Sequence, residues 1–180
     1  MRLFIAVDFE EEIKQYILSV QKQLKAIAKK GNFTRPENFH LTLIFLGEVS
    51  QSELPSVLRA VDSVEQDAEE FLIDGIGRFP RDGGDIWWLG VKDYKGIAQI
   101  QSFLSRKLCA AGFSIESRAF RPHLTLAREC IVSKEAALPA YESKRVKAER
   151  ISVMKSERIA GKLVYTELYA KTLRRTEKEK

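Results

Sequence analysis

The sequence is poor in the residues that build disulfide scaffolds and metal centres. Of its 180 residues, only two are cysteines and only two are histidines. Two cysteines are too few for a disulfide scaffold, and the simplest interpretation is a protein of the reducing cytoplasm. Zinc sites usually need three or four nearby ligands, and Cys109 and Cys130 lack a paired-ligand spacing. We therefore expect neither a metal nor another cofactor.

Long hydrophobic runs are also missing. The longest apolar runs are far shorter than the roughly 20 residues that a membrane-spanning helix needs. The short apolar start is followed at once by Asp8 and by three glutamates at 10–12, which does not fit a signal peptide. With 44% hydrophobic and 31% charged residues, the composition is ordinary for a soluble globular protein of one domain. We expect no membrane partner.

The charge balance is mildly basic. The formal net charge is +5 and the pI is near 9.2. This balance is compatible with an anionic partner such as RNA, but many basic soluble proteins bind no nucleic acid. The charge alone therefore does not identify a partner.

Both histidines occur in the same tetrapeptide, His-Leu-Thr-Leu, at 40–43 and at 123–126. The apolar residues that follow each copy predict a strand. Because side chains alternate between the faces of a strand, His40 and Thr42 share one face, and His123 and Thr125 share the equivalent face. The leucines of each copy point the other way and can enter a core, so the His and Thr side chains can line a cleft.

Two imidazoles are suited to paired proton transfer. Histidine titrates near neutral pH, so one ring can take a proton from water while the other gives one to a leaving oxygen. The neighbouring threonine hydroxyls can donate hydrogen bonds to phosphoryl oxygens and stabilise the charge of the transition state. The pattern therefore indicates phosphoester cleavage without a metal. Sequence physics alone does not say which histidine is the acid.

The tetrapeptides belong to a longer internal repeat. A shift of 83 residues carries Phe4 onto Trp87 and His40 onto His123, and each half contains a strand, a long helix and a motif strand. This order predicts two similar lobes, each a mostly antiparallel sheet covered by helices. A pseudo-two-fold axis would bring the motif strands face to face across a central groove.

The apolar periodicity predicts the individual elements. Strands are expected near 3–7, 40–46, 71–76, 86–91, 123–127, 151–154 and 164–170, and helices over 13–27, 54–64 and 97–108. Gly31 and Gly112 are expected to end the first and third helices, and Ser50 to Glu53 fits a capping box before the second. Residues 81–85 predict a hairpin turn, and Ser133 could cap a short helix through Leu138.

Several stretches resemble a known family. The chain is similar to the two-histidine phosphoesterases, and within them to the RNA 2′,3′-cyclic phosphodiesterases, also called the 2′-5′ RNA ligase family. The similar stretches are MRLFIA (1–6), RPENFHLTL (35–43), FLGE (45–48), WLGV (88–91) and FRPHLTLAR (120–128). They span nearly the whole chain, in matching order and spacing.

The resemblance implies a fold and roles for the site residues. It implies a bilobal α+β fold, in agreement with the repeat. We expect one domain over 1–173, with lobes of roughly 1–84 and 85–173, followed by a charged, disordered tail at 174–180, which has no apolar residues. It also implies that His40 donates a proton to the leaving 3′ oxygen and that His123 accepts one from the attacking water. Thr42 and Thr125 would bind the phosphoryl oxygens. The product would be a 2′-phosphate, and the reverse reaction would form a 2′-5′ bond.

Two further residues have competing interpretations. Arg121 alternates onto the face of His123 and could clamp a phosphate, or it could be a surface arginine in an ion pair. Phe4 could stack on a base, as the resemblance favours, or both faces of its strand could be buried. Arg35, Arg78 and Arg128 could line the groove, but the sequence does not place them.

The expected partner is an RNA with a 2′,3′-cyclic phosphate end, for which tRNA fragments are one candidate source, and the chain is expected to act as a monomer. A nearby alternative is the same fold acting on 2′-5′ oligonucleotides or on a small cyclic phosphate derived from ADP-ribose. A more distant alternative is a non-catalytic module that binds RNA ends. Intact His and Thr in both motifs favour the enzyme, since a binding module needs no paired acid and base.

Overall fold

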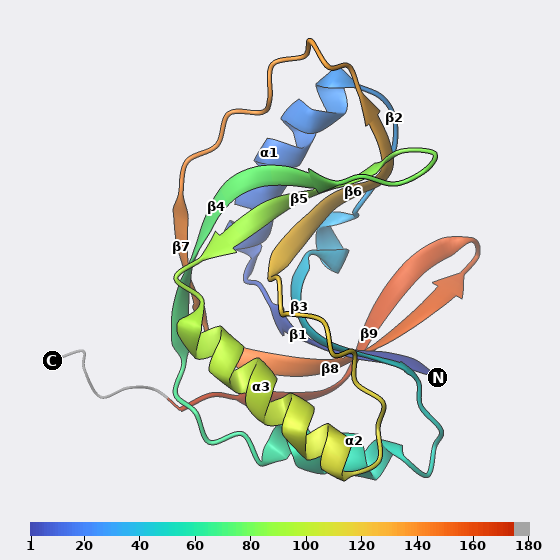
Figure 1. Ribbon diagram of the computed structural model, residues 1–180, viewed down its shortest axis with the longest axis vertical. Helices are drawn as coiled ribbons and strands as arrows, with labels where there is room; N and C mark the ends of the chain where they lie inside the picture. Colours follow the sequence, from blue (N-terminus) through green and yellow to red (C-terminus); the bar gives the residue numbers. More distant parts are fainter. Residues whose placement is uncertain (175–180) are drawn as a thin grey trace, which may run out of the picture.

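The computed structural model describes residues 1–174, which form three α-helices, one short 3₁₀ helix and nine strands in two antiparallel sheets (Figure 1). The helices are α1 (Glu11–Ile27), η1 (Pro36–Asn38), α2 (Leu54–Asp62) and α3 (Lys95–Ala110). The strands are β1 (Arg2–Asp8), β2 (Ala28–Phe33), β3 (His40–Glu48), β4 (Glu69–Phe79), β5 (Asp85–Lys92), β6 (His123–Val132), β7 (Lys144–Ala148), β8 (Arg150–Ile159) and β9 (Lys162–Thr172).

The two sheets form the two lobes. The first sheet has the strand order β3-β1-β8-β9, and the second has the order β2-β6-β5-β4-β7. Helices α2 and α3 pack against each other beside the first sheet, while α1 packs on β2 and β6 of the second (Figure 1). The motif strands β3 and β6 approach each other where the two sheets meet. The bilobal α+β fold expected from the sequence is therefore confirmed.

The lobes do not divide the chain at residue 84 as expected. Strand β4 lies in the first half of the sequence but pairs with β5 of the second lobe, and β8 lies in the second half but pairs with β1. Helix α1 likewise packs on the second sheet and α3 near the first. The two halves of the repeat therefore exchange elements, because β4 pairs with the strand directly after its hairpin turn.

Several local expectations were wrong. Helix α1 ends at Ile27, and Gly31 lies inside β2, a strand that the pattern did not predict. Strand β7 was also missed, and residues 133–138 form a turn rather than a helix, with the Ala136 N–H donating to the Ser133 carbonyl. Arg174, assigned to the tail, forms a bridge with Asp67. The rest of that tail, 175–180, lies outside the described residues.

Other expectations hold. Residues 81–85 connect β4 and β5 as an antiparallel hairpin. Gly112 ends α3 with a φ of 92°, a left-handed conformation in which glycine avoids the penalty of a Cβ. Ahead of α2, the Glu53 carboxylate accepts the Ser50 backbone N–H at 2.8 Å, which is one half of the capping box. No helix within 1–174 is long and apolar enough to cross a membrane.

Candidate active site

Each motif histidine opens its strand and shares a face with the motif threonine. Leu41 and Leu124 are fully buried, with 0% of their surface exposed, whereas His40 and His123 are half-buried. The alternation expected from the sequence is therefore observed in both strands. Opposite the motifs, Asp8 and Ala6 of β1 face His40 and Thr42, and Gly90 and Trp88 of β5 face His123 and Thr125.

Backbone carbonyls orient both imidazoles. His40 Nδ1 lies 2.7 Å from the Asn38 carbonyl oxygen, and His123 Nδ1 lies 2.8 Å from the Arg121 carbonyl oxygen. Because a carbonyl oxygen only accepts, each Nδ1 carries the proton that it donates. In the neutral ring Nε2 is then the nitrogen that carries the lone pair.

The two Nε2 atoms differ in their partners. His40 Nε2 lies 2.9 Å from Thr42 Oγ1, so the threonine hydroxyl donates to it. Within residues 1–174, His123 Nε2 has no protein hydrogen-bond partner. The lone pair of His123 Nε2 is therefore free for a water molecule, whereas that of His40 is occupied by Thr42.

Burial is the largest influence on the pKa of both histidines and lowers it, since the charged ring loses hydration. The backbone carbonyls act in the opposite direction, and the positive charge of Arg128 lowers the pKa of both rings further. His40 is also affected by Asp8, which raises its pKa, and by His123, which lowers it. Both rings therefore favour the neutral form in the free protein, and they are close enough to influence each other.

A β-bulge in the motif strand β6 sets the position of Arg128. Thr125 pairs with Trp88 and Ala127 with Trp87, so Leu126 is the extra residue. Leu126 and Ala127 are both buried, and Arg128 is exposed. The bulge therefore shifts the alternation of side chains between the two faces of the strand by one residue. Arg128 thereby joins the face of the histidines, consistent with its influence on both pKa values.

Aromatic rings surround each histidine. The Phe4 ring lies 4.8 Å from the His40 ring and is only 1% exposed. This burial favours packing beneath His40 over direct stacking on a base. Tyr165 of β9 contacts His40 edge-on, with 5.2 Å between the ring centroids, and Phe79 of β4 contacts His123 in the same way at 5.1 Å.

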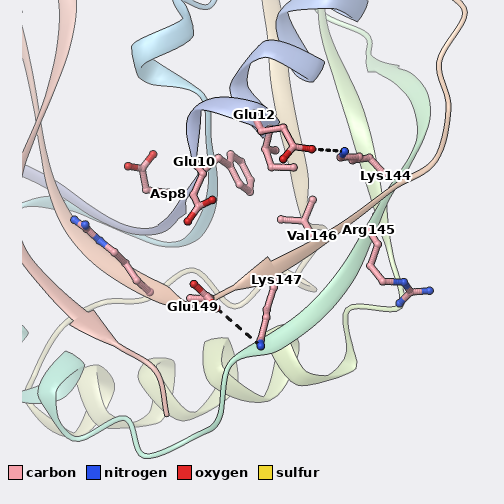
Figure 2. Close-up of a pocket in the computed structure, with 11 residues that line it drawn as sticks. Asp8, Glu10, Glu12, Lys144, Arg145, Val146, Lys147 and Glu149 are labelled. Carbon is pink, nitrogen blue, oxygen red and sulfur yellow. Dashed lines mark hydrogen bonds and ion pairs between the residues drawn. The ribbon is translucent and has the colours of Figure 1, made fainter. Parts of the chain in front are cut away.

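A small hollow opens beside His40 between β1, β8 and β9, with Ala6, Ser152, Met154 and Tyr165 in its wall. A larger cavity of about 560 Å³ lies near the start of α1 and β7 (Figure 2). Neither histidine lines the larger cavity, and four of its charged side chains pair with one another, Glu12 with Lys144 at 2.6 Å and Glu149 with Lys147 at 3.9 Å. The hollow beside His40 is therefore the better candidate for part of an active site.

Comparison with known proteins agrees with this geometry. A family model described as LigT like Phosphoesterase matches in two consecutive segments, 7–88 and 89–165, whose junction falls near that of the repeat. The chain belongs to the LigT-like phosphoesterase family. It is 32% identical to an RNA 2′,3′-cyclic phosphodiesterase of Archaeoglobus fulgidus, over 71% of this chain and 72% of that protein. It is 28% identical to one of Methanothermobacter thermautotrophicus, over 93% of this chain and 96% of that protein.

The fold matches solved structures of the LigT-like phosphoesterases over nearly the full chain. One is the crystal structure of Escherichia coli LigT complexed with 3′-AMP, with a TM-score of 0.81, 26% identity and 96% coverage of both chains. The likeness confirms that the chain is a two-lobed phosphoesterase of this family, and therefore an enzyme.

The other three arginines considered for the groove differ in their partners. Arg35 pairs with Glu37 at 3.0 Å and also donates to the Leu163 carbonyl, and Arg78 pairs with Asp85 in the β4–β5 hairpin. These two therefore have structural partners. Arg121 is exposed, and its carbonyl, rather than its guanidinium, is seen to contact His123.

The site also has members that the sequence did not single out. Trp88 of β5 lies against His123, with 6.4 Å between the rings, and its indole lies over Gly77 of β4. A Cβ on Gly77 would come within 2.3 Å of that indole, so only glycine permits this packing. Within residues 1–174, no group of three or more His, Cys, Asp or Glu side chains is placed to hold a metal ion.

Proposed function

We propose that this LigT-like phosphoesterase hydrolyses 2′,3′-cyclic phosphates at the ends of RNA, without a metal, to give 2′-phosphomonoesters. The observation that carries the proposal is the pair of histidines on the two motif strands, each with its Nδ1 held by a backbone carbonyl so that Nε2 carries the lone pair. The names of the relatives and the nucleotide bound to the E. coli structure support an RNA-end substrate.

The proposed reaction is an in-line displacement at phosphorus. Water attacks the phosphorus atom, its proton passes to Nε2 of His123, and the bond from phosphorus to the 3′ oxygen breaks. His40 gives its proton to the departing 3′ oxygen, which becomes a hydroxyl. The free lone pair on His123 Nε2 supports its role as the base, since a water can bind there without displacing a protein donor.

The donor role requires a protonated His40. Burial and Arg128 favour the neutral ring in the free protein, but a bound phosphodiester brings a negative charge beside the ring and raises its pKa. Asp8, opposite His40 in the sheet, acts in the same direction. Substrate binding would thus supply the protonation state that the donor needs.

The phosphoryl oxygens need donors from both lobes. Thr42 and Thr125 lie on the histidine faces of the two motif strands, and Arg128 joins them through the bulge. Arg121 is exposed next to His123 and is a further candidate for the RNA phosphates. By microscopic reversibility, the same groups would join a 5′-hydroxyl to the cyclic phosphate and form a 2′-5′ bond.

The test is incubation of the EDTA-treated protein with a short RNA that ends in a 2′,3′-cyclic phosphate, followed by end-group analysis. We expect a 2′-phosphate from the wild type and loss of turnover, with RNA binding kept, in His40→Ala and His123→Ala. A Thr172→Val variant, which changes an exposed threonine at the end of β9, serves as the control. A 3′-phosphate product would refute the assigned leaving oxygen, and full turnover in either histidine variant would refute the mechanism.

Two alternatives are separated by the same assay. Faster turnover of 2′-5′ oligonucleotides or of a small cyclic phosphate than of the RNA end would favour a relative with another substrate. Binding of the RNA end without any turnover would favour a non-catalytic module.

A further inference from the structure

Asn38, the last residue of η1, is a buried polar residue with only 6% of its surface exposed. Its side-chain Nδ2 donates to the carbonyl oxygen of Leu163 in β9 at 3.0 Å. Its own carbonyl oxygen accepts the Nδ1 proton of His40 at 2.7 Å. Burying an amide is costly unless its hydrogen bonds are made, and here the partner is a distant strand. A single residue therefore connects β9 to the His40 ring.

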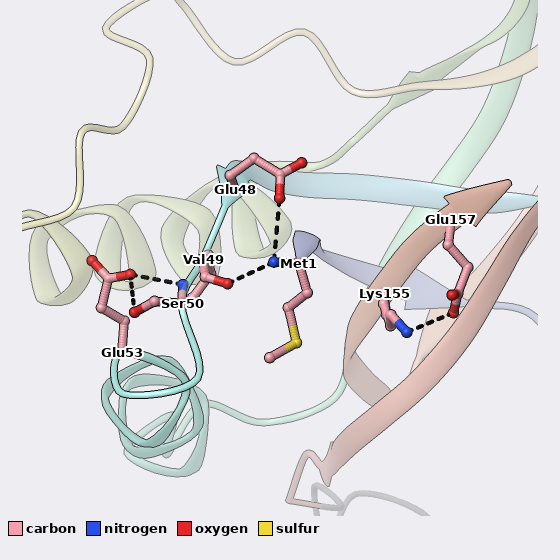
Figure 3. Close-up of polar contacts among 7 residues, drawn as sticks. All are labelled: Met1, Glu48, Val49, Ser50, Glu53, Lys155 and Glu157. Atoms are coloured by element: carbon pink, nitrogen blue, oxygen red, sulfur yellow. Dashed lines mark hydrogen bonds and ion pairs between the residues drawn. The ribbon is translucent and has the colours of Figure 1, made fainter.

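The strand that accepts this hydrogen bond belongs to a projecting hairpin. Strand β8 pairs with β1 over residues 151–156, so the β8–β9 hairpin continues beyond β1 and rises beside η1 (Figure 1). Lys155 pairs with Glu157 at 2.8 Å on β8, where the hairpin leaves the sheet (Figure 3). The Arg35 guanidinium donates to the same Leu163 carbonyl as Asn38 does. Two donors from the segment before β3 therefore fasten the hairpin to that segment.

The same strand also contacts the His40 ring directly. Tyr165, two residues after Leu163 in β9, lies edge-on to His40, with 84° between the planes and 5.2 Å between the centroids. The Tyr165 ring also packs on Phe4 at 4.8 Å, and Phe4 in turn contacts His40. The hairpin therefore reaches His40 by two routes, through Asn38 at Nδ1 and through Tyr165 at the ring.

His123 lacks this support. The shift of 83 residues that relates the motifs carries Asn38 onto Arg121, whose carbonyl contacts His123 Nδ1 in the same way. Arg121 is exposed, and within residues 1–174 its side chain makes no hydrogen bond or ion pair with another protein group. The two imidazoles therefore make the same bond to the backbone, but only His40 has an acceptor whose own side chain is fastened to another strand.

Building on the donor role proposed for His40, we propose that Asn38 is a positioning residue that fixes the tautomer and the orientation of this histidine. Proton transfer to the departing oxygen requires Nε2 to point at that oxygen, so Nδ1 has to stay on the carbonyl. A carbonyl that could move would let the ring turn or adopt the other tautomer. Asn38 prevents both by fastening the carbonyl to β9, and it does so without any contact with the substrate.

NMR of protein labelled with ¹⁵N-histidine measures this link directly, because only two rings contribute signals. His40→Ala and His123→Ala assign the signals, and above both pKa values the wild type should show the Nδ1–H tautomer at both rings. Asn38→Ala and the nearly isosteric Asn38→Leu should give a mixture of tautomers at His40 and leave His123 unchanged. Both variants should fold, because Arg35 still donates to the Leu163 carbonyl.

The pKa of His40 should also fall in both variants, because the hydrogen bond to the Asn38 carbonyl raises it. The alkaline limb of the kcat/KM profile, which reports the protonated donor, should therefore move to lower pH. Neither variant changes the other titratable and charged groups that face the ring, which are Asp8 of β1, His123 and Arg128 of β6, and Tyr165 of β9.

Steady-state hydrolysis of the cyclic-phosphate RNA is the second measurement. We expect kcat to fall by about 10- to 100-fold in both Asn38 variants, the usual range for losing a group that orients a working side chain. KM should stay nearly the same, since Asn38 is buried and binds no part of the substrate. Gln23→Leu is the matched control, because the Gln23 amide donates to the Ala140 carbonyl at 3.1 Å on the exposed side of α1. This variant should change neither ring and leave kcat as it is.

The NMR measurement needs no substrate, so it separates this inference from the proposed function. An unchanged His40 ring in both Asn38 variants, or a change in Asn38→Ala alone, would overturn the inference and leave the two-histidine mechanism intact. An altered ring with wild-type kcat would overturn it as well. A wild type that leaves the cyclic phosphate uncleaved, with the His40 ring altered by both variants, would support the link through Asn38 and count against the proposed function.

Discussion

Replacing each motif threonine by valine separates stability from catalysis at this site. Thr42 donates to His40 Nε2 at 2.9 Å, whereas Thr125 makes no equivalent hydrogen bond to His123 within residues 1–174. Valine has nearly the same shape as threonine and is equally at home in a strand. The two substitutions therefore remove the same hydroxyl from two equivalent positions, and only one of these hydroxyls has a partner in the free protein.

The expected losses follow from that difference. A net hydrogen bond contributes about 0.5–1.5 kcal/mol to the free energy of unfolding. For a protein of this length, 1 kcal/mol corresponds to roughly 2–4 °C in Tm. Thr42→Val should therefore lower Tm by about 1–6 °C, and Thr125→Val should leave it nearly unchanged. Both variants should lose about 10²–10³ in kcat, the typical cost of removing a donor to an oxyanion.

The assays are thermal unfolding of the free protein and steady-state hydrolysis of the cyclic-phosphate RNA. Thr172→Val, at an exposed position of β9, should be unchanged in both and controls for the substitution itself. Equal destabilisation by Thr42→Val and Thr125→Val would refute the difference between the two histidine environments. Unchanged kcat in either variant would refute the assignment of that hydroxyl to a phosphoryl oxygen.

Three further predictions follow from the same contacts. His40→Ala and His123→Ala should each lower kcat by about 10²–10⁴, and the double variant by much less than the product, because acid and base act as a unit; multiplicative losses in single-turnover assays would contradict this. Asp8→Asn removes a charge that raises the pKa of His40, so the alkaline limb of the kcat/KM profile, which reports a protonated donor, should move to lower pH; a shift to higher pH would contradict the assigned roles. Gly77→Ala should cost about 1–3 kcal/mol by displacing the Trp88 indole, measured by urea unfolding, and a Trp88→Leu background should suppress the loss.

Much of the site could be predicted because it depends on local rules. Alternation along a strand requires only neighbouring residues, so the shared face of His40 and Thr42 followed from four letters of sequence. The hairpin at 81–85 and the end of α3 at Gly112 depend on local backbone preferences in the same way. The internal repeat then indicated that the second motif would face the first.

The failures have a common physical cause. Strands β2 and β7 contain few apolar residues, so periodicity did not predict them. They are strands because a neighbouring strand supplies their hydrogen-bond partners. The expected division of the chain into lobes was wrong because β4 and β8 pair with strands from the opposite half of the chain. Such pairing depends on contacts between distant residues, which periodicity does not contain.

The sequence by itself determined the chemistry of this protein: two histidines, each with a threonine two residues later, in strands whose leucines are buried. Only the tertiary structure decided what surrounds them. The bulge that turns Arg128 onto the histidine face, the carbonyls that hold each Nδ1, and the burial that lowers both pKa values arise from pairing and packing between separate strands. Local residue order specifies which groups are present and which face they share, whereas their environment is set by elements that are distant in the chain.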